Sequence, residues 1–276
     1  MVKYLEIIFL ILNKLIIFQI YYIDYFISLL LRRRTFKLQF SIAKKLTTSK
    51  YLGQEFVTRT QLERQRTVDR FTIESDLTNF IDTFAMKHLI FWDIGSCVGN
   101  FSIYAARKSG TVISIEPDLL TYSTLIQNVY NSKMDNIETY PFGLFSTTGI
   151  NKLNMKEFNI AGAYNSIGRL DHQGKTFTSQ WCINIQTYSA MDLIEKNNIP
   201  IPNFIKLDVD GNELAVLQGF GDHLSDIKMK GIIIELDVYN PESKKSVDLL
   251  WAHGFRGEFP ANNLITSNYI FLKESD

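Results

Sequence analysis

The chain contains the segment Phe91-Trp92-Asp93-Ile94-Gly95-Ser96-Cys97-Val98-Gly99-Asn100-Phe101, its most informative stretch. An apolar run from Leu89 to Trp92 ends at an acid, and a loop with two glycines then leads into a helical pattern. This order is typical of a strand, a tight turn and a helix at the ligand-binding edge of an α/β sheet. Gly95 permits a sharp turn, and Gly99 permits close packing of the helix.

Apolar runs and helical patterns alternate on both sides of this segment. We expect strands at 89–92, 111–115, 137–142, 204–209, 231–236, 255–259 and 268–272, and helices at 74–86, 100–108, 118–130, 189–197, 211–219 and 242–253. Continuous apolar runs suit parallel strands that are buried on both faces. The pattern predicts an α/β protein with a doubly wound sheet. Residues 150–187 interrupt it with Gly, Asn, Ser and Thr, which predicts an inserted β-rich lobe.

An acid follows the second strand of this unit. Glu116 comes 21 positions after Gly95, where a carboxylate can accept both hydroxyls of a ribose. Cys97 stands where the dinucleotide fingerprint needs its second glycine, and its Cβ would crowd a pyrophosphate. S-adenosylmethionine has no pyrophosphate; amides at the helix start would meet its carboxylate, and Asp93 its ammonium group. We therefore expect S-adenosylmethionine rather than NAD. An ordinary strand–helix turn and a solvated strand end are the structural alternatives.

A second motif, Phe204-Ile205-Lys206-Leu207-Asp208-Val209-Asp210-Gly211-Asn212-Glu213-Leu214, places further acids at strand ends. Asp208 would face the same crevice as the glycine loop, and could orient an acceptor hydroxyl or take its proton. Glu235 ends the strand after it. For Asp210, capping of the next helix is the favoured explanation.

These motifs resemble those of the FkbM-type methyltransferases. The resemblance rests on Phe91 to Phe101, on Glu116-Pro117-Asp118 and on the run from Ile205 to Gly219, and it covers roughly residues 70–273. It implies the class I methyltransferase fold, with a seven-stranded sheet containing one antiparallel strand. It also implies methylation of a hydroxyl, commonly on a sugar or polyketide. The chain departs from the family in having Cys97 for Asn, Ser146 for an acid, and Thr187-Tyr188-Ser189 without the usual Leu-Asp pair.

The expected site combines residues from both motifs and from the lobe. The candidate catalytic residues are Asp208, Glu235 and His172; the candidate cofactor-binding residues are Asp93, Gly95, Ser96, Cys97, Gly99, Asn100 and Glu116, joined by Gly143 and Leu144 after the third strand. Candidate acceptor contacts are Tyr164, Asn165, Arg169, Trp181 and Tyr188. No metal is expected, because no Cys/His/Asp cluster has metal-ligand spacing, although the acids at the strand ends could recruit one.

The N-terminal residues form a separate segment. Residues 1–34 are mostly apolar, carry most of their polar residues on one helical stripe and end in Arg32-Arg33-Arg34. This predicts an amphipathic helix on a membrane surface. Packing on this protein or a second copy, and a true membrane span, are the alternatives. Residues 35–70 are basic and predict a connector with short helices, and residues 71–276 the methyltransferase domain.

The composition limits the function further. Lys+Arg and Asp+Glu both number 29, so no overall positive charge favours a nucleic-acid partner. Two cysteines without a disulfide framework fit a reducing, cytoplasmic location, with peripheral membrane contact through residues 1–34. We expect an O-methyltransferase that acts on a sugar, glycan or glycolipid precursor; the oligomeric state stays open. A degenerate scaffold at a membrane and a nucleic-acid methyltransferase are the alternatives, the latter supported only by the basic stretch from Arg32 to Arg70.

Overall fold

The computed structural model describes residues 19–20, 22–23, 48–162, 165–168, 173–176, 178–259 and 266–273. The chain divides into two compact units, 1–48 and 49–276. Of the first 34 residues only four are described, so the amphipathic helix stays a prediction. His172, Tyr164 and Arg169 also lie outside the described residues. Within the described ranges, no helix has the length and apolar character needed to cross a bilayer.

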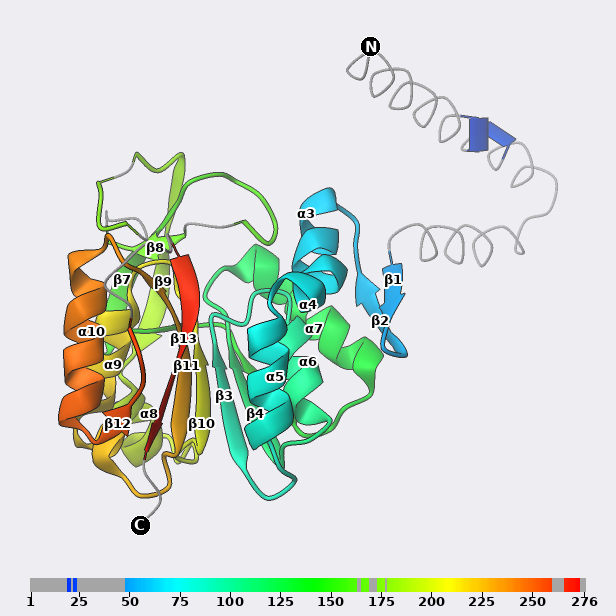
Figure 1. Ribbon diagram of the computed structural model, residues 1–276. Helices are drawn as coiled ribbons and strands as arrows, with labels where there is room; N and C mark the ends of the chain where they lie inside the picture. Colours follow the sequence, from blue (N-terminus) through cyan, green and yellow to red (C-terminus); the bar gives the residue numbers. More distant parts are fainter. Residues whose placement is uncertain are drawn as a thin grey trace. The chain divides into compact units, whose positions relative to one another are not determined.

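The larger unit is built on a seven-stranded sheet (Figure 1). Its strands, in spatial order, are β12 (Phe255–Arg256), β13 (Thr266–Lys273), β11 (Gly231–Asp237), β10 (Phe204–Leu207), β3 (Ile90–Ile94), β4 (Thr111–Ile115) and β5 (Ile137–Tyr140). β13 pairs antiparallel with both neighbours and the other pairings are parallel. The predicted class I methyltransferase topology is therefore confirmed. The strand order reverses between β3 and β10, the point at which such sheets bind ligands.

Helices cover both faces of this sheet. Figure 1 shows α8 (Ala190–Lys196), α9 (Glu213–Phe220) and α10 (Pro241–Ala252) on one side, and α5 (Ser75–Phe84), α6 (Asn100–Ala106) and α7 (Leu119–Ser132) on the other. Successive residues of a strand point to opposite faces. The sheet has one core on each face: the first packs against α8, α9 and α10, and the second against α5 and α6. In β3, Trp92 packs in the first core and Phe91 in the second, and neither side chain is more than 1% exposed. This explains the uninterrupted apolar runs of the sequence.

The interruption at 150–187 belongs to a second, four-stranded sheet. Its order is β6 (Gly143–Leu144), β9 (Trp181–Tyr188), β7 (Gly149–Met155) and β8 (Ser166–Ile167). In β9 buried and exposed residues alternate, because one face covers a small core of Leu153, Met155 and Ile185. The expected β-rich lobe is thus present in the described part of this segment.

Residues 48–73 are more ordered than the expected connector. They form β1 (Thr48–Tyr51), β2 (Gln54–Val57), α3 (Gln61–Arg64), a π-helical turn η1 (Gln65–Asp69) and α4 (Arg70–Ile73). Phe56 and Phe71 are buried in the second core. This packing was not visible in the sequence, because the segment has few apolar residues and no strong periodicity.

Candidate active site

The two loop glycines are required by the protein's own packing. Gly95 has φ +75°, and a Cβ on it would lie 1.7 Å from the carbonyl oxygen of Asp208. Gly99 has φ +80°, and a Cβ there would lie 2.3 Å from Leu125 Cδ1 of α7. Each of the two positions needs a residue that tolerates a positive φ and that has no side chain. Gly95 therefore brings the loop against the end of β10, whereas Gly99 makes room for α7.

The loop amides are largely used inside the protein. The N–H groups of Gly95 and Ser96 both donate to the carbonyl of Ile115, each at 3.0 Å. The N–H of Cys97 donates to Glu116 Oε2 at 3.0 Å. Cys97 has φ +51°, a left-handed conformation that suits Gly or Asn better than Cys. These three N–H groups are therefore not free for a ligand, and the amides at the helix start, which we expected to meet the cofactor carboxylate, begin at Asn100.

Glu116 lies at the end of β4 and is held by the backbone. Its second oxygen accepts from the N–H of Asp118 at 2.8 Å, and the residue is 8% exposed. Burial raises the pKa of its carboxyl to about 8, although the two N–H donors oppose the shift. Each oxygen keeps a lone pair for a further donor, as ribose hydroxyls would require.

Lys206, which the sequence reading passed over, connects the two motifs. Its Nζ donates to the Gly95 carbonyl at 2.8 Å and lies 3.3 Å from both Asp93 Oδ1 and Asp208 Oδ2. Asp93 also accepts from Ser102 Oγ at 2.6 Å and is fully buried. Burial lowers the pKa of Lys206, but Asp93 and Asp208 outweigh it and the net shift is upward. Lys206 is therefore a buried cation that ties the loop to the end of β10.

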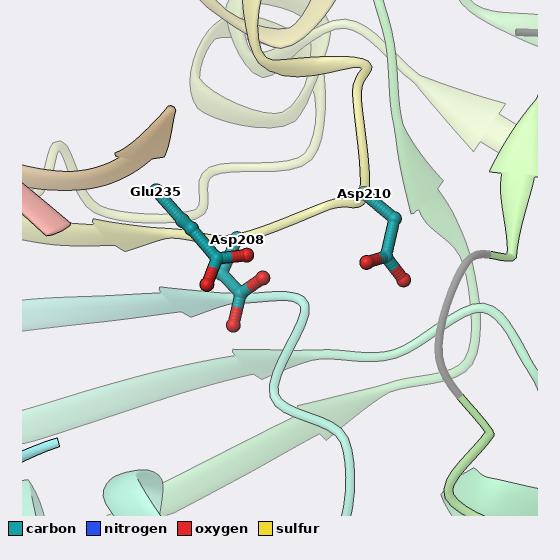
Figure 2. A group of neighbouring side chains, drawn as sticks. All are labelled: Asp208, Asp210 and Glu235. Carbon is teal, nitrogen blue, oxygen red and sulfur yellow. The ribbon is translucent and has the colours of Figure 1, made fainter. Parts of the chain in front are cut away.

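Asp208 and Glu235 form a carboxyl pair with unequal proton affinities. Figure 2 shows their carboxyl groups side by side, with Asp210 set apart. The charge of Asp208, followed by burial, raises the pKa of Glu235 to about 10. Burial would raise the pKa of Asp208, but Lys206 and Arg70 hold it below its usual value. At neutral pH the pair therefore carries its proton on Glu235 and its charge on Asp208.

The sequence favoured Asp210 as the cap of the next helix, and this prediction is wrong. The helix α9 begins at Glu213 with Asn212 at its N-cap, and Asp210 has φ +53°. Within the described ranges, Asp208, Asp210 and Glu235 are the one group of His, Cys, Asp or Glu residues that could hold a metal ion, with ligand atoms within 4.8 Å of one another. Lys206 and the proton on Glu235 already offset part of this charge.

A cavity of about 270 Å³ joins these parts. Seven of the predicted site residues line it: Gly95, Cys97, Glu116, Gly143, Leu144, Asp208 and Glu235. Four others, Asp93, Ser96, Gly99 and Asn100, do not. Among the expected acceptor contacts, Asn165 lines the cavity with a buried Oδ1 that has no hydrogen-bond partner among the described residues. Trp181 is 54% exposed elsewhere, and Tyr188 packs on Phe142.

Two arginines of residues 48–73 also line the cavity, and they were not predicted from the sequence. Arg66 lies on η1 and Arg70 on α4, one helical turn later. Arg70 pairs with Glu74 at 2.5 Å. Their spacing of four residues was the available signal, because such residues share a helix face. Together the cavity offers a carboxyl group for a ribose, a charged acid beside a protonated one, and two guanidinium groups.

Comparison with known proteins agrees with this arrangement. The model of the family described as "Methyltransferase FkbM domain" matches residues 93–256. The hexuronic acid methyltransferase AglP of Haloferax volcanii is 26% identical over 163 residues, which cover 59% of this chain and 62% of that protein. The chain thus spans less than two thirds of this relative.

Two solved structures share a more distant likeness. The FkbM methyltransferase of Methylobacillus flagellatus has a TM-score of 0.45 and 17% identity, over 67% of this chain and 44% of that one. TYW2 of M. jannaschii, solved with AdoMet, has a TM-score of 0.40 and 10% identity, over 82% and 86%. The matched domain covers more than half of the chain and contains both motifs of the cavity, so the chain belongs to the FkbM methyltransferase family.

Proposed function

We propose that this protein is an S-adenosylmethionine-dependent O-methyltransferase that methylates a hydroxyl of a sugar or glycan precursor. One observation carries the proposal: a single cavity at the strand-order reversal is lined by the glycine loop, Glu116, Asp208 and Glu235. Family membership and the name of the Haloferax volcanii relative support the reaction and the sugar class. Asn165, whose buried Oδ1 has no hydrogen-bond partner among the described residues, also lines this cavity and adds a polar group to it.

The residues of the cavity fit such a cofactor. Glu116 would accept the ribose hydroxyls, and the loop around Gly95 and Cys97 would face the amino-acid end. Bound S-adenosylmethionine supplies a methyl group made electrophilic by its sulfonium. The protein's part is to hold an acceptor oxygen in line with that methyl and to exclude water, which contributes on the order of 7–11 kcal/mol in favourable cases.

Asp208 is the proposed partner of the acceptor hydroxyl. It is ionised, 23% exposed toward the cavity, and fixed by Lys206. Asp208 would accept the proton that the acceptor hydroxyl loses on methylation, and the cofactor would supply the methyl group and keep the electron pair of the broken bond on its sulfur. Glu235, protonated at neutral pH, is proposed to donate a hydrogen bond rather than to act as the base. His172 stays a candidate by sequence alone.

The cofactor assignment is tested by calorimetric titration of the full chain with S-adenosylhomocysteine, with NAD as the control ligand. Glu116→Gln should weaken binding by roughly 10- to 100-fold, because the amide keeps only one acceptor oxygen and its NH2 group would face the N–H of Cys97 or Asp118. Glu138→Gln is the matched control, since Glu138 lies exposed on neighbouring β5 and accepts a hydrogen bond from Tyr140. No binding to the unaltered protein would refute the proposal and favour the scaffold alternative.

We also propose that residues 1–34 bring the enzyme to the cytoplasmic face of a membrane, where lipid-linked glycans would be acceptors. The support is the polar stripe along an otherwise apolar segment and its triple arginine end. Deletion of these residues should shift the protein from the membrane fraction to the soluble fraction of lysed cells. An unchanged membrane fraction would contradict this role.

A further inference from the structure

The π-helical turn η1 holds Arg66 in a fixed place. Just before it, Glu63 is fully buried and accepts from Arg59 Nη2 at 2.8 Å and from Thr124 Oγ1 of α7 at 3.0 Å. Thr67 Oγ1 donates to the Glu63 carbonyl at 2.8 Å, and Phe71 beyond the turn packs in the core. A π-helical turn widens the helix locally and is frequent at functional sites. The backbone that carries Arg66 is therefore anchored on both sides.

The guanidinium of Arg66 is half-buried and lines the cavity, yet it has no hydrogen bond or ion pair to any residue that the structure describes. Two other arginines of this segment are paired, the exposed Arg59 with Glu63 and the partly buried Arg70 with Glu74. Burial lowers the pKa of Arg66, but Cys97 and the acids Asp208, Asp210 and Glu74 outweigh it, and the net shift is upward. Arg66 therefore stays charged, and its N–H donors are left for an acceptor group of a ligand in the cavity.

The neighbouring acids leave these N–H donors unpaired. Asp208 and Asp210 act on Arg66 through space, but neither forms an ion pair with it, and Asp208 is held by Lys206 instead. The amides of Gly95, Ser96 and Cys97 are also spent on Ile115 and Glu116. Among the described residues that line the cavity, Arg66 is thus a cation without an ion pair, whereas Arg70 is paired with Glu74.

We propose that Arg66 binds a carboxylate in this cavity. Arginine suits the task, because its planar fork matches both oxygens of a carboxylate. Two reactants can bring that group: the amino-acid end of the cofactor, or an acceptor that is a uronic acid. The inference rests on the proposed function, since it assigns a ligand group to the same cavity.

The experiment compares Arg66→Met, Arg66→Lys and the unaltered full chain by calorimetry. Arg64→Met is the matched control, because Arg64 lies exposed on the preceding turn of α3. The first arm titrates S-adenosylhomocysteine and its decarboxylated analogue. The second titrates glucuronate and glucose, with and without saturating S-adenosylhomocysteine. Circular dichroism confirms that each variant is folded.

The two sources give different results. If the cofactor supplies the carboxylate, Arg66→Met should weaken S-adenosylhomocysteine by roughly 10- to 100-fold and leave the decarboxylated analogue unchanged. If the acceptor supplies it, glucuronate should bind the unaltered chain better than glucose, and Arg66→Met should abolish that preference. Arg66→Lys should retain part of either effect.

The inference is overturned if folded Arg66→Met matches the unaltered protein and Arg64→Met for every ligand. That result differs from failure of the proposed function, in which the unaltered chain itself does not bind S-adenosylhomocysteine.

Discussion

Replacing Lys206 by Met should destabilise the fold far more than the length of its ion pairs suggests. Lys206 is 4% exposed and Asp93 is completely buried, so the variant leaves a carboxylate inside the protein with one hydroxyl donor, Ser102. Removal of one partner of a buried pair costs about 3–5 kcal/mol. The Gly95 carbonyl also loses its donor. We expect the free energy of unfolding to fall by about that amount.

A surface pair supplies the control. Lys108 lies 2.6 Å from Asp82, closer than Lys206 lies to Asp93, but their side chains are 41% and 43% exposed. Exposed pairs contribute about 0–1 kcal/mol, so Lys108→Met should change the unfolding free energy little. Both variants are measured by urea unfolding, monitored by tryptophan fluorescence.

A second substitution tests the cause. Asn at position 93 removes the stranded charge, so Lys206→Met combined with Asp93→Asn should recover a large part of the loss shown by Lys206→Met alone. A loss of less than about 1 kcal/mol in Lys206→Met, or no recovery in the double variant, would refute the electrostatic explanation.

Three further predictions follow from the same site. Gly95→Ala should lower the free energy of unfolding by about 2–5 kcal/mol, because strain at φ +75° adds to a collision of the new Cβ 1.7 Å from the Asp208 carbonyl oxygen. Gly53→Ala is the control: its φ is +78°, but no atom lies within 4 Å of the new Cβ, so the loss should be only about 1–2 kcal/mol. Equal losses in the two variants would contradict this explanation. Cys97→Asn should raise the melting temperature, with a gain of up to about 1 kcal/mol, and Cys97→Val should lower it, because φ is +51°; the reverse order would be inconsistent with backbone strain. Glu235 takes up a proton on folding between its usual pKa of 4.5 and its folded value of about 10, so the stability it contributes declines as pH rises through that window; Glu235→Gln should flatten the pH dependence of urea unfolding, and an unchanged slope would disprove the shift.

The sheet and the ends of its strands were predictable because they depend on local patterns. Apolar runs, the glycine loop and acids at strand ends such as Glu116 and Asp208 are all visible in the sequence, and the resemblance to the FkbM-type methyltransferases implied the seven-stranded topology. The contact of Lys206 with Asp208 could also have been predicted from the sequence. It stands two residues before Asp208 on a strand, so both side chains share a face.

Other features depend on contacts that no local pattern encodes. Arg66 reaches the cavity because Glu63 and Phe71 anchor a short segment to α7 and the core, far away in sequence from Asp208. The loop amides could not be assigned either, because their acceptor, Ile115, lies on the adjacent strand β4. The left-handed φ of Asp210 likewise follows from the turn after β10 and overrides the helix-capping tendency of Asp.

The position of Lys206 also explains why two adjacent acids take different roles. Asp208 and Glu235 cannot both be charged at neutral pH, and a cation beside only one of them settles which keeps its proton. Lys206 lies on the strand of Asp208, so the charge stays there and Glu235 holds the proton. A carboxylate with a lowered pKa is a weak base toward an alcohol. Asp208 is therefore suited to orient the acceptor hydroxyl and to take its proton late, once bonding to the methyl group has made that oxygen acidic.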